Sequence, residues 1–237
     1  MTRALIVSGH LVDLPDRRPP RFPQSVAGRV AAEMDAVFEE WGIGPGTTVV
    51  CGGARGADLI GAELALRRGA RVVVCLALPP DDFVRESVDM PGPAGAEWRE
   101  RFEAVTARAE VRLPPPDADV DAPPDVDAPD VGAAPDVGAA PGAEAGAGAR
   151  SAAAPGEKGE GAPGAGGRAE VDARVFARAN ARMVETARAL DPGLRAVVVW
   201  DGRAGDGPGG TGDLVARLGY DPADPRLRVI DPTTLSP

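Results

Sequence analysis

Two glycine-rich segments carry the residues of this chain that are best suited to hold a polar ligand. They read Cys-Gly-Gly-Ala-Arg-Gly-Ala-Asp (51–58) and Gly-Asp-Gly-Pro-Gly-Gly-Thr-Gly-Asp (205–213). Each follows an apolar run that predicts a buried strand and precedes a helical pattern. A helix start presents unpaired N–H groups and the positive end of its dipole, and glycine lets a phosphate approach that backbone. At one edge of a parallel sheet, the two segments would form a cleft of nucleotide size. The expected ligand-binding residues of these segments include Gly52, Gly53, Gly56, Gly209, Gly210 and Thr211.

Two charged side chains belong to the first segment. The guanidinium of Arg55 can donate two hydrogen bonds to a phosphate, or it can form an ion pair with Asp58 or Glu63 that holds the turn. The ligand role is the interpretation we favour for Arg55. Asp58 can contact the ligand or cap the helix that follows it, and the sequence leaves both roles open.

Polar residues also follow the first and fourth predicted strands, at the edge where ligands bind in parallel sheets. His10 is the only histidine and comes directly after Ser8 and Gly9. This position favours a polar contact with a ligand over a structural role. Asp201 can accept hydrogen bonds from ribose hydroxyls, act as a general base, or simply form a turn. One histidine and two cysteines in apolar contexts predict no metal site, and no cofactor is expected.

Composition separates a core-forming part of the chain from a biased segment. Residues 114–168 are mostly Ala, Pro, Gly and Asp, and their ten acidic and three basic residues contribute −7 to the net charge of −10. A segment with so few large apolar residues cannot offset the entropy lost on ordering, so we predict a disordered insertion. The remainder is only mildly acidic and lacks the basic face that duplex nucleic acid requires, so no duplex binding is expected.

The pattern outside this segment predicts one α/β domain. Five mostly apolar runs alternate with helical patterns, which is typical of a parallel sheet covered on both faces. The runs are 3–8, 47–51, 71–78, 195–200 and 227–230. We predict a single Rossmann-like, doubly wound domain with a mostly parallel sheet of about five strands, built from 1–113 and 169–237. No secretory pattern and no run of membrane-spanning length is found, so a cytoplasmic protein without membrane contact is expected.

The order of the motifs along the chain is more specific than any single motif. The set comprises Ser8-Gly9-His10, Arg21-Phe22-Pro23, Gly52–Asp58, Leu78-Pro79, Arg178, Asn180, Arg182-Met183, Trp200-Asp201 and Gly209-Gly210-Thr211. It resembles the SLOG superfamily, the Rossmann-like group that includes the DprA/Smf proteins and the LOG phosphoribohydrolases. The similarity extends over nearly the whole chain outside the insertion.

The resemblance implies a cleft for a nucleotide or nucleotide-derived ligand, and a homodimer as one expected assembly. In LOG-like enzymes a Pro-Gly-Gly-x-Gly-Thr turn holds the phosphate, a glutamate after it is catalytic, and an upstream helix supplies an arginine. Arg178 or Arg182 would match that arginine. Val215 and Ala216 replace the glutamates, and Asp213 is the carboxylate that remains. These departures favour binding over hydrolysis of an N-glycosidic bond.

Three functions follow, in order of preference. The first is a regulatory domain that binds or senses a nucleotide-derived ligand. The second is a nucleotide N-glycosidase, in which Asp201, Asp206 or Asp213 replaces the missing glutamate and Arg182 or Arg178 contacts the phosphate. The third is a DNA-processing or interaction factor of the DprA kind, which the mild acidity of the chain disfavours.

Overall fold

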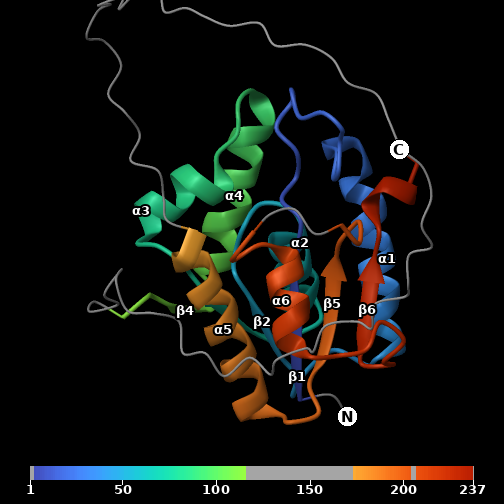
Figure 1. The fold of residues 1–237 in the computed structure, drawn as a ribbon. Helices are drawn as coiled ribbons and strands as arrows, with labels where there is room; N and C mark the ends of the chain where they lie inside the picture. Colours follow the sequence, from blue (N-terminus) through green and yellow to red (C-terminus); the bar gives the residue numbers. More distant parts are fainter. Residues whose placement is uncertain (1–2, 116–172, 204–206, 237) are drawn as a thin grey trace, which may run out of the picture. The chain divides into compact units, whose positions relative to one another are not determined.

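The computed structural model describes residues 3–115, 173–203 and 207–236, which form a six-stranded parallel sheet between two layers of helices (Figure 1). The strands are β1 (Ala4–Gly9), β2 (Thr48–Cys51), β3 (Arg71–Cys75), β4 (Glu110–Arg112), β5 (Arg195–Val199) and β6 (Leu227–Ile230). They lie in the order β4-β3-β2-β1-β5-β6, and all neighbouring pairs are parallel. The predicted Rossmann-like, doubly wound α/β fold is therefore confirmed.

Helices cover both faces of this sheet. On one face lie α1 (Ala27–Glu40), α2 (Ala57–Arg67) and α4 (Pro93–Thr106), and on the other lie α5 (Ala173–Leu190) and α6 (Thr211–Leu218). The short elements are a 3-10 turn η1 (Gln24–Val26), α3 (Pro80–Phe83), a π-helical turn η2 (Val84–Val88) and a 3-10 turn η3 (Pro232–Thr234).

Alternation within the central strand β1 builds a core on each face. Leu5 and Val7 belong to the cluster under α1 and α2, whereas Ala4 and Ile6 belong to the cluster under α5 and α6, and all four are fully buried. Successive strand side chains point to opposite faces, so an unbroken apolar run supplies both clusters. Gly61 lets α2 approach this strand, because a Cβ there would lie 2.4 Å from Val7 Cγ1.

The sheet has one strand more than the five predicted. The extra strand, β4, has only three residues, Glu-Val-Arg, and pairs with β3 at the edge of the sheet. Two of its three residues are charged, so it contains no apolar run, and an edge position tolerates such charges. Between β3 and α4, the chain forms α3 followed directly by η2.

The order of the strands reverses direction beside β1. The strands β2, β3 and β4 extend from one side of β1, and β5 and β6 extend from its other side. Connections that leave β1 and β5 at their carboxyl ends therefore diverge, and a crevice forms between them. Gly9 makes this junction tight: its φ is 146°, and a Cβ there would lie 2.3 Å from Val199 O.

Both parts of the predicted domain contribute to the sheet, since β1–β4 precede the predicted insertion and β5 and β6 follow it. From residue 116 onward, the predicted disordered insertion at 114–168 lies outside the described residues. Within the described ranges, no helix combines the length and the apolar character needed to cross a membrane.

Candidate functional site

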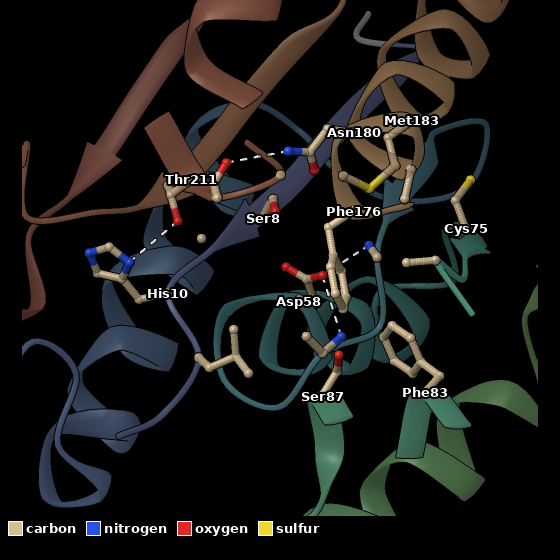
Figure 2. A pocket seen from close by; sticks show the side chains of 18 of the residues that line it. Ser8, His10, Asp58, Cys75, Phe83, Ser87, Phe176, Asn180, Met183 and Thr211 are labelled. Atoms are coloured by element: carbon tan, nitrogen blue, oxygen red, sulfur yellow. Dashed lines mark hydrogen bonds between the residues drawn. The ribbon is translucent and has the colours of Figure 1, made fainter. Parts of the chain in front are cut away.

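A cavity of about 190 Å³ lies at the crevice beside the carboxyl ends of the strands. Loops that follow β1, β2 and β3 line it together with α5 and the start of α6 (Figure 2). The structure thus brings together segments that are about 200 positions apart in the sequence. The predicted site residues that line the cavity are Ser8, Gly9, His10, Gly52, Asp58, Gly209, Gly210 and Thr211.

The second glycine segment delivers the N-terminus of α6 to the cavity. Gly209 has a φ of 84°, and a Cβ there would lie 2.4 Å from the Cβ of Phe176 on α5. Only glycine therefore allows the turn to lie this close to α5. The N-cap residue is Gly210, which has no side chain to accept the N–H groups of the first turn. Those N–H groups and the helix dipole favour an anion at this end of the cavity.

A hydrogen-bonded network beside this turn fixes the only histidine. His10 Nδ1 lies 3.3 Å from Thr211 Oγ1, and His10 Nε2 lies 3.0 Å from Asp201 Oδ1. Arg21 donates to both carboxylate oxygens of Asp201, at 2.9 and 3.0 Å. The imidazole is thereby held with its Nδ1 edge toward Thr211 (Figure 2). Asp201 does not line the cavity itself, but it fixes the orientation of His10, which does.

The carboxylate of Asp201 is held in its charged form. Burial raises the pKa of Asp201, but hydrogen bonds from Arg21, from the Arg203 N–H and from His10 outweigh burial and hold that pKa well below its ordinary value. The negative charge of Asp201 is balanced by the guanidinium of Arg21, whose side chain is only 11% exposed. Closer to solvent, Arg17 also lines the cavity and lies 3.4 Å from Asp13. Each of these two guanidinium groups is thus paired with a carboxylate.

Asp58 is a buried carboxylate in the cavity lining, only 4% exposed. Its Oδ2 accepts hydrogen bonds from Gly52 N at 2.9 Å and from Ala54 N at 3.4 Å. Burial raises the pKa of Asp58 to about 7, although hydrogen bonds from Ala54, Ser8, Gly52 and Gly53 partly oppose the shift. Asp58 therefore holds the glycine turn after β2, which differs from the helix-capping role considered from the sequence.

The other end of the cavity is apolar. Phe83 from α3, Met183 from α5, and Ala77 and Cys75 near the end of β3 line it, whereas Phe176 on α5 packs beside Gly209. Burial raises the pKa of the Cys75 thiol, so this side chain stays neutral and adds to the apolar wall. Figure 2 shows Asp58 and Ser8 between this apolar end and the pair formed by His10 and Thr211. The cavity can therefore receive a molecule with an anionic end, a polar middle and a flat apolar end.

Arg55 does not line the cavity, although the sequence favoured a ligand contact. It is 7% exposed, and its guanidinium donates to Val12 O and to Asp89 O, each at 3.1 Å. The alternative ion pairs with Asp58 or Glu63 are not formed either. Arg55 instead ties the first glycine turn to the loop after β1 and to the segment after η2.

Several other predicted site residues also lie outside the cavity lining. Arg182 donates to the carbonyls of Leu113 and Leu76, at 3.0 and 2.6 Å. Asp213 accepts from Asn180 Nδ2 and Arg217 Nε, both at 2.9 Å. Three further residues have no place in the lining: Arg178, which is half-buried on α5 one turn before Arg182, and Gly53 and Gly56.

The two glycines outside the lining have a packing role. A Cβ on Gly53 would lie 2.7 Å from Val74 Cγ1, and a Cβ on Gly56 would lie 2.7 Å from His10 O. Both residues have positive φ values, 86° and 102°. They let the first glycine segment fold tightly against β3 and against the loop after β1.

The expected ligand-binding residues did not include those that α5 contributes to the cavity, although Asn180 and Met183 are among the motifs of the resemblance. Phe176, Asn180 and Met183 are spaced at i, i+4 and i+7 and so share one face of α5. That spacing was a usable signal for the face, but the cavity on that face arises only when α5 packs beside α6. Phe83 and Ser87 belong to α3 and η2, whose break at Val84 has no clear sequence signal.

Comparison with protein-family models and with curated proteins found no match for this chain. Among the described residues, no group of three or more His, Cys, Asp or Glu side chains is placed to hold a metal ion.

Proposed function

We propose that this protein binds a nucleotide or a nucleotide-derived ligand in the cavity, as a sensing or regulatory domain of the SLOG type. One observation carries the proposal: the uncapped glycine turn before α6 and the fixed His10 meet an aromatic pocket within one cavity, at the point where the strand order reverses. Ligands of open α/β sheets bind at such switch points.

The phosphate would lie against Gly209, Gly210 and Thr211. Backbone N–H groups at the start of α6 would donate to its oxygens, and the hydroxyl of Thr211 and the imidazole of His10 are within reach of the same space. Arg17 lines the cavity from the loop after β1 and would add positive charge. Together these groups match the charge and the donor geometry of a phosphate.

The base would lie at the apolar end. Phe83 offers a flat face, and Met183 is a flexible thioether that adapts to a ring placed beside it. The volume of about 190 Å³ is below the several hundred Å³ typical of sites for larger ligands. The size therefore favours a mononucleotide over a dinucleotide.

Titration calorimetry with the full chain tests this proposal. Nucleoside 5′-monophosphates should bind, and the matching nucleosides should bind at least about tenfold more weakly, because they lack hydrogen bonds to a charged phosphate. Thr211→Val keeps the shape of the side chain and removes its hydroxyl, so it should weaken monophosphate binding and leave nucleoside binding unchanged. Thr106→Val on α4 is the matched control. The proposal fails if a folded protein binds no monophosphate, or binds monophosphates and nucleosides equally.

Hydrolysis of an N-glycosidic bond is the second candidate, and Asp58 is the observation that favours it. Its carboxyl group lines the cavity and has a pKa raised to about 7, so both protonation states are available near neutral pH. Of the carboxylates considered from the sequence, Asp201 and Asp213 do not line the cavity, and Asp206 lies outside the described residues. For this activity, the parent protein should release free base from nucleoside monophosphates, and Asp58→Asn should not. If the parent releases no base over a long incubation, this activity is excluded.

A further inference from the structure

The polar middle of the cavity holds the carboxylate of Asp58. The backbone N–H groups of Gly52 and Ala54 both donate to its Oδ2, at 2.9 and 3.4 Å. Hydrogen bonds from Gly53 and Ser8 also stabilise its charged form. Figure 2 shows the other carboxylate oxygen turned away from the Gly52 and Ala54 N–H groups. Because Asp58 lines the cavity, that oxygen can accept a hydrogen bond from a ligand there.

The place of Asp58 along the cavity matches one part of a nucleotide. The glycine turn with Thr211 lies on one side of it, and Phe83 lies on the other (Figure 2). In a nucleoside monophosphate the sugar joins the phosphate to the base. With the phosphate at the turn and the base at the aromatic end, the sugar hydroxyls would therefore lie beside Asp58 and Ser8.

We propose that Asp58 accepts hydrogen bonds from the ribose 2′- and 3′-hydroxyls of the ligand, and that the site therefore selects ribonucleotides over 2′-deoxyribonucleotides. The inference rests on the proposed nucleotide binding and adds the class of sugar to it. A carboxylate is the group best suited to this task, since it only accepts and a vicinal diol offers two donors.

The glycine turn packs closely against this carboxylate. A Cβ on Gly52 would lie 2.7 Å from Asp58 Oδ2, so a larger residue at that position would displace the carboxylate. Burial costs the charged form free energy, which its raised pKa reflects. A ligand hydroxyl donated to this group would offset part of that cost, because it stabilises the charged form. The unliganded protein thus holds a charge that a diol would satisfy.

The test compares matched ribo and 2′-deoxyribo ligands by calorimetry at pH 8, with the full chain and four pairs of 5′-monophosphates. One lost hydrogen bond to a charged group corresponds to about a tenfold to hundredfold weaker affinity, and this is the expected preference for ribose. Asp58→Asn keeps an oxygen for the Gly52 and Ala54 N–H groups and replaces the other oxygen with a donor. It should lose most of the preference for ribose, and it should also bind 2′-deoxyribo ligands more weakly than the parent does, because their 3′-hydroxyl loses the same acceptor. Glu185→Gln, an exposed carboxylate on α5, should change neither affinity.

The possible results separate this inference from the function on which it rests. Equal binding of ribo and 2′-deoxyribo ligands by the parent protein overturns the assignment of Asp58 and leaves nucleotide binding standing. A preference for ribose that persists in folded Asp58→Asn shows that another group contacts the diol, and also overturns it. Absence of binding by all eight ligands overturns both proposals. Circular dichroism of each variant confirms that a loss of preference is not a loss of fold.

Discussion

The raised pKa of Asp58 makes a specific prediction about stability. The folded protein holds this carboxyl with a pKa of about 7, compared with an ordinary value of 3.8. Between these two pH values the folded state keeps a proton that the unfolded state has released, so stability falls as pH rises through this window. Below about pH 4 and above about pH 7 the group contributes no slope. Each pH unit corresponds to about 1.4 kcal/mol, so the ionised carboxylate costs about 4 kcal/mol at most.

Asp58→Asn should remove that cost. The carboxamide stays neutral at every pH, and its oxygen can still accept from the N–H groups of the glycine turn. The variant should therefore be more stable than the parent at pH 8, by up to about 4 kcal/mol, and equal to it near pH 4. Other carboxylates, including Asp201, titrate in both proteins, so the difference between the two curves isolates Asp58.

Urea unfolding of the parent and of Asp58→Asn, at half-unit steps from pH 4 to pH 9, measures this difference. The expected curve of the difference rises from zero and levels off above pH 7. A variant that is less stable at pH 8 would refute the reasoning, because it would mean that the charged oxygen holds the turn more strongly than burial disfavours it. A difference that does not change with pH would refute it as well, since titration of Asp58 is its only stated cause.

Three further predictions concern the rest of the site. Asp201→Asn leaves Arg21 buried without its carboxylate and should lower the free energy of unfolding by about 3 kcal/mol at pH 7, measured by urea unfolding, with a much smaller effect at pH 2. Gly209→Ala should force the glycine turn away from Phe176 and should lower monophosphate affinity in calorimetry at least about tenfold, because its φ is 84° and its Cβ would lie 2.4 Å from a neighbour. Arg55→Met should lose about 2 kcal/mol of stability through two lost hydrogen bonds, yet the folded variant should bind monophosphates as the parent does; weaker binding would restore the ligand role expected from the sequence.

The sheet was predictable because its strands are buried on both faces. An unbroken apolar run such as Arg195–Val199 has one plausible place, the middle of a covered parallel sheet. The edge strand β4 lacks that constraint, and its pairing with β3 depends on tertiary position alone. The predicted sheet therefore included the four central strands and the edge strand β6, and it missed the edge strand β4, which has no apolar signature of its own.

The site was predictable where a residue's role depends on its position relative to a strand, and unpredictable where it depends on side-chain direction. Ser8, Gly9 and His10 follow a strand that had to end at the ligand edge, and they line the cavity. Arg55 also follows a strand, but its long side chain turns to two carbonyls of other loops. No local pattern specifies those partners, because they come from segments 30 to 45 positions away along the chain.

Asp58 shows why the position of a residue along the chain and the direction of its side chain must be treated separately. Its position at the start of α2 is a local property, and a helix-capping role accounts for it at the level of sequence. The structure instead places it as a buried acceptor for the turn before it, in a cavity whose remaining groups come from α5 and α6. A neutral side chain would satisfy that turn with less electrostatic cost. Retaining a carboxylate there is a local conflict of the sort that proteins tolerate at functional sites, and the two measurements on Asp58→Asn, stability against pH and preference for ribose, determine whether binding accounts for it.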